Sequence, residues 1–361
     1  MTFEDMMQMK RLGETAVSPD GQWLAYSVTT VNLEQNTKTP ELWLQKISGG
    51  DPIKLAVGQA GDSDPEFAPD NKHIVFVSSR DGGQQLWLAN FDPTTSATSN
   101  PHKLTSISTD ADSPKWSPDG RSVLFISSVY PDCPPIRTAD FATGNQCNTD
   151  RDAALAASKV KAQIFTHLLY RHWNHYTGDK RSHLFLVSVA DGTMRDLNPG
   201  NPHDVPPFSL EDSSCGCDFS PDSKELAFTE NPDPVPAIST NADIFTLDLT
   251  DPAAKPVKVS TAAGGDFSPA YSPDGKYLAW RSQARQGYES DQFRLVVYDR
   301  AAKTIKELMP EFKNWVDEFA WAPDSKEILF VSGTHGEGPI YSVQISGTTP
   351  ERWTTIGTPT G

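Results

Sequence analysis

The sequence predicts an all-β protein, a β-propeller built from four-stranded antiparallel blades. A Pro-Asp turn recurs along the chain, a strand of alternating apolar residues follows each turn, and two more strand-like runs complete each repeat. An internal period of about fifty residues is typical of propellers and other repeat arrays. The prolines of the repeat are Pro19, Pro69, Pro118, Pro221, Pro273 and Pro323.

Each copy of the repeat reads as a tight turn between two strands. Proline presets φ at the first central position of a β-turn, aspartate can accept a backbone hydrogen bond, and the following Gly, Asn or Ser completes the turn. An aliphatic residue and, two positions later, an aromatic residue then indicate a strand with one face in a core. These pairs are Leu24 and Tyr26, Ile74 and Phe76, Val123 and Phe125, Leu226 and Phe228, Leu278 and Trp280, and Ile328 and Phe330.

Two further strands are expected in every repeat, the third apolar and the fourth more polar. Together with the pair around the turn they make the antiparallel four-stranded sheet of a propeller blade. The third strands begin near Glu41, Gln85, His183, Asp243, Arg294 and Pro339, and the fourth strands near Ile53, His102, Arg195, Val257, Ile305 and Glu351.

The spacing of the prolines predicts six blades and one insertion. Successive steps are 50, 49, 103, 52 and 50 residues, so one step is double. A blade with a decayed signature could account for this step. An insertion at about 129–181 fits better, because the third repeat has its first two strands before Val129 and its last two after Ser182.

The insertion has a helical pattern followed by a dense group of aromatic and cationic residues. We expect an amphipathic helix over 149–172, capped by Thr149 or Asp150. Its apolar face would hold Ala157, Val160, Ile164 and Leu168.

Two segments supply candidate substrate-contact residues. One reading of the insertion is a loop that projects from the blade to contact a ligand or a partner domain. The other is an insertion that packs its aromatic residues on its own blade. In the proline-rich stretch 230–241, an acidic residue could face a cationic substrate group, or the stretch could be a solvated connector. The candidates are Arg171, His172, Trp173, His175, Tyr176, Glu230 and Asp233.

The four cysteines form two pairs in the sequence. Cys133 and Cys147 bracket a loop rich in Pro, Gly and Asn, and we expect a disulfide between them. Cys215 and Cys217 lie in Cys-Gly-Cys, where a disulfide would close a small strained ring, so free thiols are expected. No clustered Cys and His spacing indicates a metal site.

Composition narrows the classes of function. The net charge is −16, from 31 basic and 47 acidic residues, which argues against a nucleic-acid partner. This acidity serves solubility, or it attracts cationic groups such as the free amine of a peptide. No apolar run is long enough for a membrane span, and the first residues lack the features of a signal peptide. We expect a periplasmic or secreted bacterial location, with the cytoplasm as the alternative.

Motifs for common catalytic and cofactor sites are absent. The sequence contains no Gly-x-Ser-x-Gly, His-Glu-x-x-His, P-loop or Gly-x-Gly-x-x-Gly pattern. We therefore assign no catalytic residue and expect no cofactor.

Several segments together resemble the N-terminal propeller of the prolyl oligopeptidase family of serine peptidases. The similarity is greatest to its acylaminoacyl-peptidase and dipeptidyl peptidase V-like branch. It rests on the opening Thr-Phe-Glu-Asp-Met, on the Ser-Pro-Asp-Gly repeats, and on the segments 171–176, 178–185 and 239–245. The Pro-Asp repeat alone is shared with TolB-like propellers.

The resemblance implies a role beside a catalytic domain. In that family the propeller caps a C-terminal α/β-hydrolase domain whose Ser-Asp-His triad cleaves short peptides. By this resemblance the chain gates and holds peptide substrates for an exopeptidase that removes dipeptides or acylated residues from peptide N-termini. Its partner is then its own hydrolase domain, which is absent from this sequence. A stand-alone TolB-like propeller that binds other proteins is the alternative.

The resemblance also implies an incomplete ring. Family rings are expected to hold seven blades, whereas this chain reaches Gly361 after six. Exposed faces on the first and last blades would favour self-association, so a homo-oligomer is a further expectation.

Overall fold

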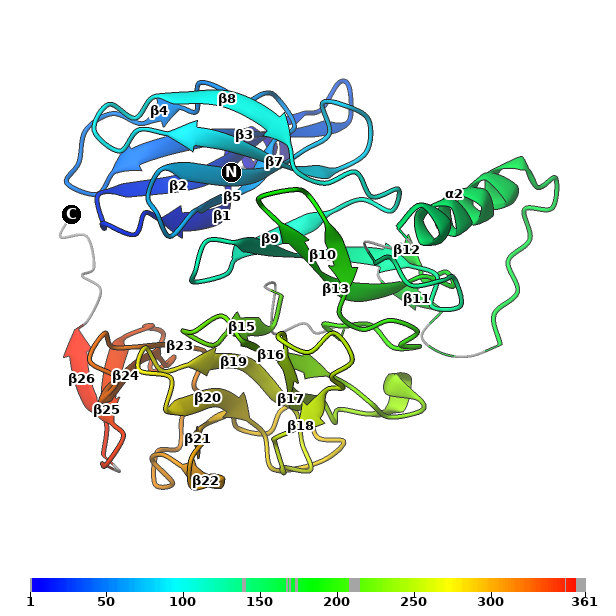
Figure 1. The fold of residues 1–361 in the computed structure, drawn as a ribbon. Helices are drawn as coiled ribbons and strands as arrows, with labels where there is room; N and C mark the ends of the chain where they lie inside the picture. The colour runs from blue at the N-terminus through cyan, green and yellow to red at the C-terminus, as the bar shows by residue number, and fades with distance from the viewer. Residues whose placement is uncertain are drawn as a thin grey trace. The chain divides into compact units, whose positions relative to one another are not determined.

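The computed structural model describes residues 2–137, 141–166, 168, 170–172, 175–207, 215–347 and 349–354. The chain divides into two compact units. The first holds 1–162 and 179–202, and the second holds 163–178 and 203–361. Three four-stranded antiparallel sheets lie in each unit, and Figure 1 shows the strands of each sheet side by side. The predicted fold class, a propeller of four-stranded blades, is confirmed.

The first unit begins with helix α1 (Phe3–Gln8), which Thr2 and Asp5 cap reciprocally. Its sheets have the orders β1-β2-β3-β4, β5-β6-β7-β8 and β9-β10-β13-β14. The strands are β1 (Arg11–Val17), β2 (Trp23–Asn32), β3 (Thr37–Lys46), β4 (Ile53–Lys54), β5 (Ser63–Phe67), β6 (His73–Ser78), β7 (Gln85–Phe91), β8 (Thr98–Lys103), β9 (Asp112–Trp116), β10 (Ser122–Val129), β13 (Arg181–Ser188) and β14 (Met194–Asp196).

The second unit repeats the same order in three further sheets. A two-stranded hairpin, β11 (Arg171–His172) with β12 (His175–Tyr176), and a short 3-10 helix, η1 (Pro236–Ile238), accompany them. The strands are β15 (Cys217–Phe219), β16 (Glu225–Glu230), β17 (Asp243–Asp248), β18 (Val257–Lys258), β19 (Asp266–Tyr271), β20 (Tyr277–Ser282), β21 (Arg294–Asp299), β22 (Thr304–Glu307), β23 (Glu318–Trp321), β24 (Glu327–Val331), β25 (Ile340–Gln344) and β26 (Glu351–Thr354).

The Pro-Asp turn has one geometry in all six sheets. The residue after the aspartate has a positive φ of 56–71° and donates its amide to the carbonyl of the Ser or Ala before the proline. One carboxylate oxygen of the aspartate accepts the amide two residues later, at 2.8–3.2 Å. This bond links the aspartate side chain to the backbone across the turn. The aspartates are Asp20, Asp70, Asp119, Asp222, Asp274 and Asp324.

Four of the six sheets share an unusual backbone conformation at or beside the first strand, five residues before the proline of the turn. The residue there has a positive φ of 49–57°, and in three of these strands the register with the second strand shifts beside it. Such a bulge lets one strand carry an extra residue and bend. The four residues are Asp64, Ser113, Gly216 and Ser268.

The positive φ at Gly216 explains why the expectation of free thiols at Cys215 and Cys217 was wrong. The two cysteines flank Gly216 and form a disulfide, with their Cα atoms 5.2 Å apart. That separation lies within the ordinary range for disulfides. Because other sheets adopt the same backbone without cysteines, the repeat itself brings the two sulfurs together.

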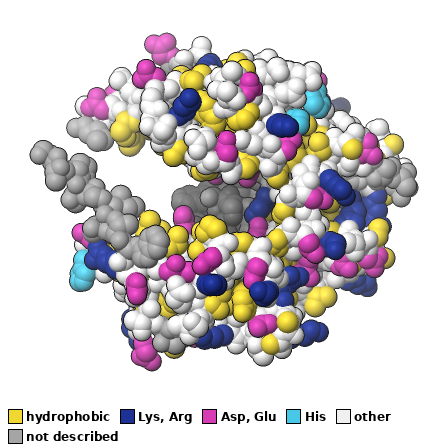
Figure 2. Space-filling view, turned by 60° about the vertical axis from the view of Figure 1, so that its left-hand side comes forward, with side chains coloured by type: hydrophobic (Ala, Val, Ile, Leu, Met, Phe, Trp, Pro, Cys, Tyr) yellow, Lys and Arg dark blue, Asp and Glu magenta, His cyan; other side chains and the backbone are white. Residues whose placement is uncertain are grey.

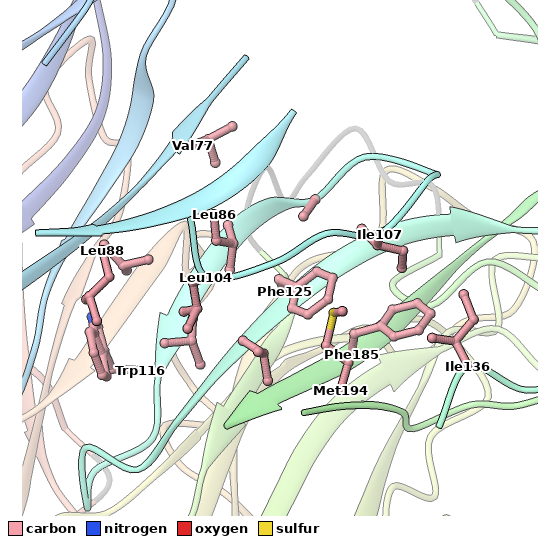
Figure 3. Close-up of a cluster of buried hydrophobic side chains, with 14 of the residues drawn as sticks. Val77, Leu86, Leu88, Leu104, Ile107, Trp116, Phe125, Ile136, Phe185 and Met194 are labelled. Atoms are coloured by element: carbon pink, nitrogen blue, oxygen red, sulfur yellow. The ribbon is translucent and has the colours of Figure 1, made fainter. Parts of the chain in front are cut away.

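Buried side chains cover both faces of the central sheet in each unit. In β6, Ile74 and Phe76 belong to the cluster shared with the β1–β4 sheet. Val75 and Val77 belong to the cluster shared with the β9-β10-β13-β14 sheet, where Leu86, Leu88, Trp116, Phe125 and Phe185 also lie (Figure 3). In the second unit, Leu278 and Trp280 pack against the β15–β18 sheet, and Ala279 packs against the β23–β26 sheet. The central strands are therefore apolar on both sides.

Indole groups join neighbouring sheets at equivalent positions. Trp116, two residues before its proline, donates Nε1–H to the carbonyl of Glu66 in the preceding sheet at 3.3 Å. Trp321 does the same to Ala270 at 3.0 Å. Both acceptors lie three residues before their own prolines. The aromatic residue that precedes the turn thus fixes the neighbouring sheet as well as its own.

The insertion lies between β10 and β13, which pair residue by residue from Ser122 and Ser188 to Val129 and Arg181. A disulfide joins Cys133 to Cys147, with Cα atoms 5.8 Å apart. Cys147 lies on helix α2 (Phe141–Ala157), so the expectation of a helix over 149–172 was wrong at both ends. Tertiary contacts set its position, because Phe141 packs on the core and buried Asn148 accepts the Tyr130 amide.

The expected apolar face of that helix does not form. Thr149 and Asp150 lie inside α2 and do not cap it. The residues after Ala157 have no helical structure where they are described. Val160, Ile164 and Leu168 are 70%, 89% and 54% exposed.

We predict that Asp324→Ala lowers the free energy of unfolding by about 1 kcal/mol, the usual net value of one such hydrogen bond. In this turn Ala322 replaces the serine, so the bond to the Lys326 amide is the one tested. Urea unfolding measures the change. Asp324→Asn keeps the acceptor oxygen and should lose much less. Equal losses in the two variants would contradict the assignment.

We also predict unequal contributions from the two disulfides. Replacing Cys133 and Cys147 by serine should cost about 3 kcal/mol, because the bond closes a loop of about fifteen residues. Replacing Cys215 and Cys217 should cost about 1.5 kcal/mol or less, since that loop is short and the bulge needs no disulfide. Urea unfolding of the two double variants makes the comparison. An equal or larger loss at Cys215 and Cys217 is the contrary result.

Candidate functional site

The structure places four of the predicted contact residues on one hairpin. Arg171 pairs with Tyr176, and His172 pairs with His175, across strands β11 and β12. Trp173, predicted from the same motif, lies outside the described residues. The arrangement puts one guanidinium, one phenol and two imidazole-bearing residues on neighbouring positions of a short ribbon.

An aromatic stack accompanies the hairpin. The Phe165 ring lies 5.5 Å from the Tyr176 ring and 5.1 Å from the Tyr170 ring, between centroids. Tyr176 remains 59% exposed and Tyr170 42% exposed. These rings contact one another and still present surface to solvent, which suits contact with a ligand or a partner.

The two acidic candidates have different surroundings. Glu230 is the last residue of β16, lies opposite Asp243 and is buried. Asp233 accepts hydrogen bonds from the Ser239 hydroxyl and, at 3.3 Å, from Nδ2 of the Asn241 side chain. These bonds fold the proline-rich loop around Asp233, so its carboxylate organises the loop.

A group of carboxyl side chains on the first strands was not predicted. Burial, together with the charges of Glu14 and Asp112, raises the pKa of Asp64 to about 6. Burial raises the pKa of Glu66 to about 7, and the charge of Lys115 opposes this shift. The sequence could have indicated this group, because Glu14 and Asp64 occupy the same place in their repeats, five residues before the proline.

A second buried carboxyl pair lies in the other unit. Asp243 accepts from Lys258 at 2.7 Å and from Ser260 at 2.9 Å, whereas Asp266 accepts from the Trp280 indole at 2.9 Å. Burial is the main cause that raises the pKa of Asp266 to about 6, and the Asp243 charge adds to it. Both residues are fully buried, so this pair links strands rather than facing solvent.

The histidine of the 178–185 segment has a structural role. His183 is buried and its Nδ1 lies 2.9 Å from Asp196 Oδ2. Its Nε2 lies 3.1 Å from the Asn201 carbonyl. The pair joins β13 to β14 and to the turn that follows.

Within the described ranges, no three His, Cys, Asp or Glu side chains are grouped so that they could hold a metal ion. No helix in this part of the chain has the length and apolarity needed to cross a bilayer.

The raised carboxyl pKa values predict how stability depends on pH. Native Glu66 keeps its proton up to about pH 7, whereas in the unfolded chain it releases the proton near its ordinary pKa of 4.5. Raising the pH between these values therefore favours the unfolded state. Glu66→Gln should remove this loss, with a gain at pH 8 of at most about 3 kcal/mol over the wild type. Urea unfolding from pH 4.5 to pH 8 measures it. The exposed Glu34→Gln serves as the control, and a parallel pH profile in Glu66→Gln would contradict the assignment.

Comparison with known proteins identifies similar chains. The model of the TolB β-propeller domain matches residues 11–132. The dipeptidyl-peptidase 5 of Porphyromonas gingivalis is 31% identical over 355 residues, which cover 96% of this chain and 48% of that protein. The dipeptidyl-peptidase 5 of Arthroderma otae is 24% identical over 369 residues, covering 95% of this chain and 48% of the relative. The chain spans about half the length of these curated relatives.

Solved structures give the same picture of the fold. An acylaminoacyl peptidase of Pyrococcus horikoshii aligns with 98% of this chain and 46% of its own, with a TM-score of 0.65 and 14% identity. The β-propeller domain of the trilobed protease from Pyrococcus furiosus aligns with 97% of this chain and 84% of its own, with a TM-score of 0.56 and 13% identity. These findings confirm the resemblance drawn from the sequence: the fold is a β-propeller, residues 11–132 match the TolB β-propeller domain, the curated relatives are named dipeptidyl-peptidase 5, and the structural neighbours include acylaminoacyl peptidases.

Proposed function

We propose that this chain is the substrate-gating and substrate-holding propeller of a serine exopeptidase that removes dipeptides or acylated residues from peptide N-termini. The observation that carries the proposal is the similarity of 96% of the chain to about half of a dipeptidyl-peptidase 5. In this arrangement the α/β-hydrolase half implied by the resemblance performs the chemistry. The propeller limits which peptides reach it.

Holding a peptide by its N-terminus requires an anion for the free ammonium group. A buried carboxylate serves this purpose well, because a hydrogen bond to a charged group in a dry site contributes about 1.5–3 kcal/mol. Glu230 is the better of the two acidic candidates, since it is buried at the end of a strand.

The exposed hairpin supplies a second kind of contact. Tyr176 and Tyr170 offer flat apolar surface, and Arg171 on β11 is an exposed cation. Aromatic and arginine side chains dominate contact energies where peptides and proteins bind. A short ribbon on a rigid sheet scaffold presents such groups without first ordering a loop.

The test uses a protein in which this chain is joined to the hydrolase half. A fluorophosphonate probe should label that protein and should leave residues 1–361 alone unlabelled. Glu230→Gln should raise KM about tenfold for a dipeptidyl substrate with a free amine, the effect of about 1.4 kcal/mol. Hydrolysis of an acyl-blocked substrate should not change.

Glu311→Gln, a change of the same kind at an exposed position in the same unit, is the matched control. An unlabelled joined protein that releases no dipeptide or acylated residue would refute the proposed function. A labelled protein in which Glu230→Gln leaves both KM values unchanged would remove Glu230 as the anchor.

A further inference from the structure

Charge is distributed unevenly along the chain. Residues 153–178 contain no Asp or Glu, although the chain as a whole holds 47 acidic residues. Lys159, Lys161 and Arg171 lie in this stretch, which is therefore basic within a chain of net charge −16. On the face seen in Figure 2, by contrast, acidic and basic side chains are interspersed.

The second half of this stretch also exposes apolar surface. Ile164 is 89% exposed, Leu168 54% and Tyr176 59%, and the Phe165 ring contacts the rings of Tyr170 and Tyr176. These residues belong to the second unit. We define the basic aromatic patch as Ile164, Phe165, Leu168, Tyr170, Arg171 and Tyr176.

Arg171 is the charged group of the patch. It is exposed, and among the residues that the structure describes it makes no ion pair. In the same unit, Arg300 pairs with Glu225 at 2.9 Å and Arg294 with Asp291 at 3.3 Å. The guanidinium of Arg171 is thus available to a carboxylate from another molecule, for which its geometry is well suited.

We propose that the basic aromatic patch binds the part of a peptide substrate that carries Asp or Glu beside apolar side chains. The inference rests on the proposed function and adds a substrate class to it. Apolar side chains of the peptide cover Ile164 and the aromatic rings, and its carboxylates pair with Arg171. The acidity of the remaining chain disfavours such a peptide elsewhere, which directs it to this patch.

Two other occupants fit the charges less well. An anionic membrane surface would attract the patch but repel a chain of net charge −16. A second copy docked through a two-fold interface would place the same basic patch on itself, with like charges opposed. A peptide with acidic and apolar residues meets neither difficulty.

The binding experiment uses residues 1–361 and fluorescein-labelled twelve-residue peptides. One peptide alternates Glu and Leu, a second replaces every Glu by Lys, and a third replaces every Leu by Ser. Fluorescence anisotropy at low salt should show the Glu-Leu peptide binding at least about tenfold more tightly than either of the others. Its affinity should fall as NaCl is added, because exposed charge pairs are screened by salt.

Variants with matched controls locate the site. Arg171→Glu should weaken the Glu-Leu peptide about tenfold, and Ile164→Ser about fivefold. Lys255→Glu makes the same charge change at another exposed position of the unit, and Ile238→Ser replaces an isoleucine that is 79% exposed. Both controls should change affinity less than about twofold.

Several results would overturn the inference. These are equal binding of the three peptides, or equal effects of the patch variants and their controls. Self-association by sedimentation equilibrium that Arg171→Glu abolishes would assign the patch to a second copy. Binding to phosphatidylserine vesicles in place of the peptide would assign it to a membrane. Peptide binding without any peptidase activity in the joined protein would refute the proposed function alone, and activity without peptide binding would refute this inference alone.

Discussion

The six sheets depend on one hydrogen bond, which recurs in all six Pro-Asp turns. The aspartate of each Pro-Asp turn accepts the amide two residues later, and the chain then enters the second strand in register with the first. Because the following residue has a positive φ, the turn reverses the chain with the right-handed twist that a sheet requires. A short polar contact at the surface thereby sets which side chains of the next strand enter the core.

The same few residues also control packing between sheets. The aromatic side chain before the turn reaches the preceding sheet, as Trp116 and Trp321 do through their indole nitrogens. Strands such as β6 and β20 are buried on both faces, since each lies in a sheet that packs against two others in its unit. Turn, strand register and sheet stacking are therefore properties of one short motif.

Local regularity decided what could be predicted from the sequence. The strands were predictable because six copies of one pattern support one another, down to the single double step that located the insertion. Helix α2 was misplaced because Cys147, Asn148 and Phe141 fix it through contacts with distant residues, whereas the apolar spacing after Ala157 has no packing partner. The disulfide at Cys215 was missed because the bulge that permits it is visible only when the dihedral angles of several sheets are compared.

The candidate site was predictable only in part. The hairpin residues were predicted as a group because their types cluster in the sequence, and Arg171 does face Tyr176 across the ribbon. The cluster of acidic side chains Glu14, Asp64 and Asp112 was missed because these residues are some fifty positions apart in the sequence. Each of them looks like an ordinary strand residue. Proximity across sheets depends on stacking, which no single repeat reveals.

The pairing of Val129 with Arg181 has a consequence for evolution. These residues stand opposite each other across one strand spacing of about 5 Å, so the two ends of the intervening segment meet without bending the sheet. Any segment whose ends come equally close could occupy this position while β10 and β13 keep their register. The third blade is thus a point at which segments could be exchanged between relatives, and a new surface could be acquired there without altering the scaffold.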